Sequence, residues 1–283
     1  MRRIILIAVM IGFFPACHAQ KFRFSPVAQT TLVQREEHPP AGPQDRQSRL
    51  KQLFLQAGCA NSELGEQPQK LSGANVICRL PGKSHETIIV GASYSQAEPD
   101  NWSGAALLPS LFQALTGRKR HHTFVFVAFA DGNSDLAGAQ YFAGHLSRED
   151  VNRTEAMINL DPLGFSPTKI SSAESDKKLV DSFFKVTYIL NQMASQVDIS
   201  KGTRVDSEPF AALQIPQITI HSLTQEAVAG LHTTDPTRPV LAAPDVANDG
   251  AQFRADHYYH SYRLVSGYLA YLDETLKPRH HEK

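Results

Sequence analysis

The sequence predicts an α/β fold in which a largely parallel sheet is covered by helices on both faces. Two observations predict it. Short apolar runs rich in β-branched residues alternate with longer stretches of helical periodicity, which is typical of parallel strands joined by crossover helices. No internal repeat and no later linker interrupts this alternation, so we expect one domain, over residues 47–276.

The first nineteen residues have the features of a signal peptide. Two arginines precede an apolar run, 4–14, that is too short to span a bilayer. A cut after Ala19 would leave Gln20 as the new N-terminus. A second interpretation is a lipoprotein signal that ends at Ala16, with Cys17 acylated. Both interpretations predict an exported protein, periplasmic or extracellular, with no membrane contact unless Cys17 is lipidated.

The next segment, 20–46, is expected to be an extended arm. It holds three prolines and a glycine between Pro39 and Pro43 and has no sustained period. A helical pattern starts near Gln44 with apolar residues on one face, and Gly58 ends it. At the other end of the chain we expect a polar tail, 277–283.

The central elements follow from periodicity and length. Four short apolar runs predict buried strands, at 87–92, 123–130, 156–160 and 217–220. Four longer stretches predict helices, at 103–115, 135–146, 176–193 and 252–272. Asp100 and Asn101 are candidate caps for the first of these helices.

Charge and cysteine content limit the possible functions. Lysine plus arginine equals aspartate plus glutamate at 28 each, without a long basic block, which argues against a nucleic-acid partner.

If Cys17 is removed with the signal, only Cys59 and Cys78 remain. In an oxidising compartment such a pair predicts a disulfide rather than a metal site or a nucleophile.

Polar residues follow the predicted strands, where sites form in parallel sheets. They are Ser93 and Ser95, Asp131, Asp161 and His221. Asp100 and His232 lie in loops that can fold back to the same edge. Two aspartates and a histidine suit a divalent metal. Each also has a structural interpretation, because Asp100 can cap a helix and Asp161, before Pro162, can make a turn.

The order of four segments carries more information than any one residue. They are Asp100-Asn101-Trp102-Ser103-Gly104, Asn159-Leu160-Asp161-Pro162-Leu163-Gly164, Asp206-Ser207-Glu208-Pro209-Phe210 and His232-Thr233-Thr234-Asp235. This series resembles metallopeptidase family twenty-eight, which includes bacterial leucyl aminopeptidases and is related to glutaminyl cyclases. The resemblance runs from about Leu50 to Leu272. It implies a three-layer α/β/α sandwich around a mixed, mostly parallel sheet, with two zinc ions at its carboxyl edge. Asp100 would then bridge the metals, Asp161 would bind one, and His232 the other.

This chain departs from the family pattern at the positions that bind the metals and transfer the proton. Where the family reads Ala-His-x-Asp, this chain has Ser93 in place of the ligand histidine and Ser95 in place of the aspartate that orients it. Where the family has two adjacent glutamates, a general base and a ligand, this chain has Gly132 and Asn133. Each zinc would keep two strong ligands, whereas catalytic zinc normally has three. Asp131 lies beside the position of the missing base.

Three functional hypotheses follow. The leading one is a catalytically impaired protein that binds a peptide or small-molecule ligand, with Asp206 and Glu208 holding a substrate amine or serving only as surface charges near a turn. The second is an active metallo-exopeptidase with one zinc held by Asp100, Asp161 and His232. The third is a serine hydrolase that uses Ser93, although the final glycine of the Gly-x-Ser-x-Gly elbow is absent.

Overall fold

The computed structural model describes residues 23–69, 73–94, 101–130, 136–173, 175–199, 205–223 and 252–279. Its described strands form one mixed eight-stranded sheet in the order β1-β2-β4-β3-β5-β8-β6-β7. The strands are β1 (Leu64–Gln69), β2 (Gly73–Leu80), β3 (Thr87–Ser93), β4 (Thr123–Phe129), β5 (Thr154–Leu160), β6 (Lys169–Ser171), β7 (Ser195–Gln196) and β8 (Gln217–His221).

The centre of the sheet is parallel and its flanks are mixed. β4, β3, β5 and β8 all run in the same direction, whereas β2 runs antiparallel to β4 and β6 antiparallel to β8. β3, β4 and β5 are apolar and buried along almost their whole length, as strands covered on both faces are. Their carboxyl ends therefore meet at one edge, where parallel α/β sheets place their sites.

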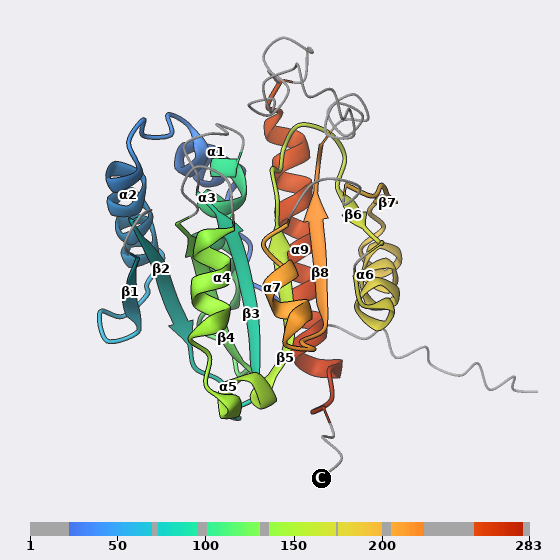
Figure 1. The fold of residues 1–283 in the computed structure, drawn as a ribbon. Coiled ribbons are helices and arrows are strands. Elements are labelled where there is room, and N and C mark those ends of the chain that lie inside the picture. Colours follow the sequence, from blue (N-terminus) through green and yellow to red (C-terminus); the bar gives the residue numbers. More distant parts are fainter. Residues whose placement is uncertain are drawn as a thin grey trace, which may run out of the picture.

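Helices cover both faces of the sheet (Figure 1). One face packs against α1 (Gln29–Glu36), α2 (Pro43–Gln56), α3 (Asn101–Leu115), α6 (Lys177–Leu190) and α9 (Ala255–Thr275) around the larger apolar cluster. The other face packs against α4 (Ala137–Gly144) and α7 (Glu208–Ala212), with α5 (Arg148–Arg153) beside them, around a smaller cluster. The α/β/α sandwich is confirmed, and the predicted central strands and helices are present within three residues of their expected ends.

The expected extended arm is wrong over part of its length. The segment 20–46 contains α1 and the first residues of α2. An eight-residue helix is too short to be stable alone. Here Leu32 is buried, and the Arg35 guanidinium donates to Ser110 Oγ at 2.7 Å and Gln113 Oε1 at 2.8 Å on α3. The helix α1 is therefore stabilised by its tertiary contacts with α3.

A disulfide joins Cys59, just after α2, to Cys78 in β2. It is the pair expected from the cysteine count. The two residues are 19 positions apart, and the bond ties the end of a covering helix to the flank of the sheet. The β1–β2 hairpin at this flank was not predicted, because β1 carries Pro68 and several polar residues.

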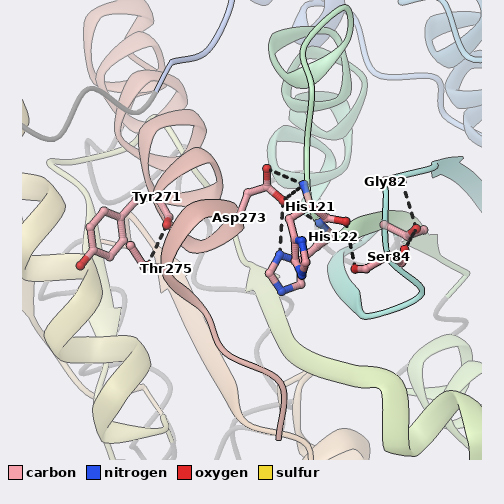
Figure 2. A network of polar contacts seen from close by, with 8 residues as sticks. Gly82, Ser84, His121, His122, Tyr271, Asp273 and Thr275 are labelled. Carbon is pink, nitrogen blue, oxygen red and sulfur yellow. Dashed lines mark hydrogen bonds and ion pairs between the residues drawn. The ribbon is translucent and has the colours of Figure 1, made fainter.

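The last turns of α9 are fixed to the start of β4 at the amino edge of the sheet (Figure 2). The Asp273 carboxylate accepts the backbone N–H groups of His121 and His122, and its Oδ1 lies 3.3 Å from His122 Nδ1. The His122 ring is fully buried. Because this network is at the edge opposite the carboxyl ends of β3, β4 and β5, we assign it to the joining of α9 to the sheet.

Among the described helices, none combines the length and apolar character needed to cross a bilayer. The expected signal peptide, 1–19, lies outside the described residues.

Candidate metal and ligand site at the carboxyl edge

The structure describes part of the expected site. Ser93, Asp161, Asp206, Glu208 and His221 are described, with the disulfide cysteines Cys59 and Cys78. The remaining expected positions lie outside the described residues, namely Ser95, Asp100, Asp131, Gly132, Asn133 and His232.

Ser93 and Asp161 lie at equivalent points of neighbouring strands. β3 and β5 are parallel, and Gly91 pairs with Asn159. Ser93 and Asp161 each follow that pair by two residues, so both stand at the carboxyl edge. The Ser93 side chain is buried at 7% exposure. The Asp161 backbone N–H donates to Ile220 O at 3.0 Å, which holds the turn after β5 against β8.

The close approach of neighbouring side chains at Gly91 identifies the face on which these residues lie. A Cβ there would lie 2.3 Å from Phe129 Cε2 and 2.9 Å from Met157 Cε, both in the cluster under α4 and α7. Residues two apart on a strand share a face. Ser93 therefore lies on the face covered by α4 and α7, and so does Asn159, which pairs with Gly91. Asp161 follows two residues later, and its carboxylate accepts from the Asn159 amide.

A buried amide links Asp161 to the next strand. Asn159 Nδ2 donates to Asp161 Oδ1 at 3.1 Å and to Thr219 Oγ1 at 3.4 Å. Thr219 Oγ1 lies 3.0 Å from Ser207 Oγ, at the start of α7. Asn159, Thr219 and Ser207 are all buried. The network orients the Asp161 carboxylate and connects it to the segment that carries Asp206.

The structure separates the two expected substrate-binding residues. Asp206 is buried at 4% exposure, whereas Glu208 is exposed at the first position of α7. Glu208 fits the surface-charge interpretation. Asp206 does not, since a buried carboxylate is retained only where neighbouring polar groups or a ligand compensate its lost hydration.

Both ring nitrogens of His221, at the end of β8, take part in hydrogen bonds. Its Nε2 lies 2.9 Å from Val197 O, and its Nδ1 lies 3.3 Å from the backbone nitrogen of Leu223. Burial lowers the pKa of His221 to about 4. The ring is therefore neutral at pH 7, with Nε2 donating and Nδ1 accepting, and both nitrogens serve the fold.

Asn75, which sequence reasoning missed, makes hydrogen bonds on both sides of residues 131–135. Asn75 Oδ1 accepts the Ala130 backbone N–H at 2.9 Å, and its Nδ2 donates to Gly138 O at 3.0 Å. These two contacts bracket residues 131–135. The Asn75 side chain is fully buried. The signal in the sequence was one polar residue, Asn75, within the apolar run 74–78.

Ser93 does not occupy a nucleophile elbow. In that motif the serine lies on a sharp turn from a strand directly into a helix. Here β3 ends at Ser93 and α3 begins at Asn101. Tyr94 continues away from Ser93, with its N–H donating to Phe129 O at 3.0 Å and its hydroxyl to Ala74 O at 2.7 Å. The geometry argues against a serine hydrolase.

The described part of the site fits a metal only in part. Asp161 is a carboxylate oriented by a second-sphere amide, as metal-binding carboxylates usually are. Its neighbour Ser93 supplies a neutral hydroxyl, which zinc seldom takes as a ligand. Among the described ranges, no group of three or more histidine, cysteine, aspartate or glutamate side chains is arranged to hold a metal ion.

Comparison with known proteins gives a consistent result. The sequence model of peptidase family M28 matches residues 75–263. A probable leucine aminopeptidase of Trichophyton verrucosum (strain HKI 0517) is 27% identical over 135 residues, which are 41% of this chain and 36% of that protein. The chain thus spans about a third of the length of this curated relative.

Solved structures share the fold at low identity. The zinc aminopeptidase BSAP from Bacillus subtilis superposes with a TM-score of 0.58 at 19% identity, covering 73% of this chain and 52% of that one. An Acidobacteriales bacterium glutaminyl cyclase superposes with a TM-score of 0.66 at 16% identity, covering 87% of this chain and 92% of that one.

Proposed function

The chain belongs to peptidase family M28, and we propose that it is an exported member that binds peptide N-termini at the family's site without hydrolysing them efficiently. The single observation that carries this proposal is that Ser93 and Asp161 hold equivalent positions, each two residues after the paired Gly91 and Asn159. By the family resemblance, a second ligand of a metal at Asp161 would stand at position 93. The family resemblance expects a histidine there.

The exchange of a histidine for Ser93 weakens the metal site chemically. A catalytic zinc takes three protein ligands and a water. By the resemblance, the zinc at Asp161 keeps Asp100 and Asp161 as strong ligands, and the zinc at His232 keeps Asp100 and His232. When bound, zinc would lower the pKa of its water and polarise the scissile carbonyl. With two strong ligands each, the expected occupancy is low.

Proton transfer is impaired independently of the metal. Gly132 and Asn133 stand where the family has its general base and a further ligand. Neither side chain can accept a proton from water near neutral pH. Loss of a general base alone lowers rates by about 100- to 10,000-fold. Asn75 hydrogen-bonds to Ala130 and Gly138, on either side of these positions.

The retained carboxylates favour a cationic ligand group. Asp161 and the buried Asp206 belong to segments linked through Asn159, Thr219 and Ser207. A peptide's α-ammonium group matches these carboxylates in charge and hydrogen-bond donors. The neutral overall charge supports a small ligand rather than nucleic acid.

One observation favours a second candidate, an active exopeptidase with a single zinc. The Asn159 amide pre-orients the Asp161 carboxylate, an arrangement that strengthens metal binding. Asp161 would then hold one zinc together with Asp100 and His232. Such an enzyme would release N-terminal residues slowly, since its base would still be missing.

The decisive experiment measures zinc content, turnover and binding on one folded preparation. We expect no stoichiometric zinc after equilibration with excess metal, and no chelator-sensitive release from aminoacyl chromogenic substrates. We expect peptides with a free N-terminus to bind and their N-acetylated forms not to bind. Two tightly held zinc ions with turnover would refute the proposal, and one zinc with turnover would establish the second candidate.

A matched pair of variants locates the binding site. Asp206→Asn removes the buried charge and should weaken peptide binding at least fivefold. Glu208→Gln removes the exposed charge two residues away and should leave binding unchanged. Equal effects of the two variants would refute the assignment of Asp206.

A further inference from the structure

The tail after α9 passes from one covering layer of the sheet to the other. α9 packs in the larger apolar cluster on one face, and α7 packs on the other face with α5 beside it. Figure 1 shows the end of α9 at the amino edge, the edge at which α5 leads into β5. Arg279 follows Thr275, the last residue of α9, by four positions. At this edge Arg279 reaches the layer that contains α5 and α7.

Arg279 makes three hydrogen bonds to three segments. Its backbone N–H donates to Glu155 Oε2, in β5, at 2.8 Å. Its guanidinium donates to Val151 O, in α5, and to Gln214 O, between α7 and β8, each at 2.6 Å. A guanidinium can serve two carbonyl groups at once because its donors are held in a planar fork. One residue therefore ties the tail to three segments of the opposite layer.

The Glu155 carboxylate beneath this tail is buried, at 2% exposure. Its charge faces Arg279 of the tail, His122 at the start of β4 and Glu86 before β3. His122 in turn lies 3.3 Å from Asp273 of α9. Burial raises the pKa of Glu155 by more than the Arg279 N–H, the Arg279 charge and His122 lower it, and Glu86 adds to the rise. Glu155 therefore loses its charge in milder acid than an exposed glutamate does.

Gln214 links Arg279 to the end of α7. The Gln214 backbone N–H donates to Ala211 O at 2.9 Å, in the last turn of that helix. Its C=O accepts from the Arg279 guanidinium. Gln214 has a positive φ of 58°, a conformation that costs free energy in a residue other than glycine. Hydrogen bonds through both its N–H and its C=O hold Gln214 in this turn.

The other end of α7 belongs to the candidate site. The helix has five residues, Glu208–Ala212, so its ends lie about 7.5 Å apart. So short a helix is not stable alone, and its position depends on the contacts at its two ends. Just before its start, Ser207 Oγ lies 3.0 Å from Thr219 Oγ1, and Asp206 is buried. The bond from Arg279 therefore acts on the helix that directly follows Asp206.

We propose that Arg279 is a positioning residue of the peptide site, which fixes the end of α7 while Glu155 is ionised and thereby holds Asp206 in place. Protonation of Glu155 removes the negative charge that faces Arg279 and loosens this hold. The affinity for peptide N-termini should then fall in mild acid. The inference rests on the proposed function for its ligand, whereas the hold on α7 needs no ligand.

The first test compares Arg279→Gln with Lys277→Gln in the full chain by amide hydrogen exchange. Lys277 is an exposed cation in the same tail. In Arg279→Gln we expect exchange across residues 208–215 to become at least about fivefold faster, because α7 loses a bond at one end. Lys277→Gln should leave this exchange unchanged. Unchanged exchange in β3 and β4 shows that the effect is local rather than global unfolding, and Arg279→Lys, which keeps the charge, should recover part of the protection.

The second test measures peptide affinity by calorimetry at about pH 7.5 and about pH 5.5, with a peptide that has a free N-terminus. We expect the parent chain to bind more weakly at the lower pH. Arg279→Gln should weaken binding at least about fivefold at the higher pH. Glu155→Gln keeps an acceptor for the Arg279 N–H but does not titrate. The pH dependence of the parent should therefore disappear in Glu155→Gln, a result that a purely structural joint would not give.

The outcomes separate this inference from the proposed function. Unchanged exchange across α7 in Arg279→Gln would overturn the inference even if peptides bind, and so would equal effects of Arg279→Gln and Lys277→Gln. Faster exchange across α7 in a chain that binds no peptide would support the hold on α7 and refute the proposed function alone. Peptide binding with the parent's pH dependence intact in Glu155→Gln would overturn the role given to Glu155.

Discussion

Ser93 in β3 and Asp161 after β5 hold equivalent positions at the carboxyl edge, each two residues beyond the paired Gly91 and Asn159. Neighbouring parallel strands thereby offer a hydroxyl and a carboxylate on the same face of the sheet. An imidazole at position 93 would complete a three-ligand set with Asp161 and, by the family resemblance, Asp100. By the resemblance, the residue at position 93 therefore sets how many ligands a metal at Asp161 would have.

We predict that Ser93→His increases zinc affinity at least about tenfold, equivalent to about 1.4 kcal/mol. The reason is that imidazole replaces a neutral hydroxyl beside Asp161. Competition against a fluorescent chelator, with metal content by mass spectrometry, measures the change. The matched control is Ser195→His on β7, where the side chain is exposed and far from Asp161 in the sheet order. Equal gains in both variants would mean that the added histidine binds zinc non-specifically.

The second prediction concerns the amide beneath Asp161. Asn159→Leu removes the donors to Asp161 Oδ1 and Thr219 Oγ1 at nearly constant volume. We expect the free energy of unfolding to fall by about 1 to 3 kcal/mol, because buried polar groups lose their partner. Urea denaturation measures it. A double-mutant cycle with Thr219→Val isolates the link between the two strands, and full additivity would show that the link contributes nothing.

The third prediction concerns the disulfide. Replacing Cys59 and Cys78 by serine opens a loop of 19 residues. The free energy of unfolding should fall by about 3 kcal/mol, mainly because the unfolded chain regains freedom. Guanidinium denaturation of the variant and of the oxidised parent measures the difference. Addition of a reductant should destabilise the parent alone, and a reductant effect of the same size on the variant would contradict the assignment.

The fourth prediction follows from His221, whose pKa burial lowers to about 4 in the folded state. In the unfolded chain the histidine pKa is about 6.5. Between these values the unfolded chain binds more protons than the folded one, so stability falls as pH falls from about 6.5 to about 4. The full loss is about 3 kcal/mol.

Urea denaturation between pH 4 and 7.5 tests this contribution. His221→Gln keeps a side chain that can donate to Val197 O but does not titrate. The slope of stability against pH should therefore flatten within this window. An unchanged slope would show that the pKa of His221 is the same in the folded and the unfolded chain. The control is His260→Gln, an exposed histidine on α9.

The fifth prediction concerns the anchor of α9 shown in Figure 2. Asp273→Asn replaces one acceptor oxygen by an amide group that faces the N–H donors of His121 and His122. We expect the free energy of unfolding to fall by about 1.5 to 3 kcal/mol, as is typical for hydrogen bonds to charged groups. Asp256→Asn, on the exposed first turn of the same helix, should have a smaller effect. Thermal unfolding compares the two variants.

The central sheet and its helices were predictable because their signal is local. The four parallel strands are nearly continuous apolar runs, and the long helices carry one apolar face. Elements made by tertiary contact were missed. α1 depends on Arg35 reaching α3, β1 is polar and contains Pro68, and β7 has only two residues.

Residue identity and order were enough to predict the α/β class and the family. The ligand and base replacements at positions 93, 132 and 133 are what the family resemblance implies and stay a prediction. Which residues meet could be seen only in the folded chain. There Asn159 links Asp161 to Thr219, Asp206 is buried while Glu208 is exposed, and both ring nitrogens of His221 make hydrogen bonds. The physical reason is that register and burial depend on how distant segments pack, whereas a sequence pattern reports the periodicity of one segment at a time.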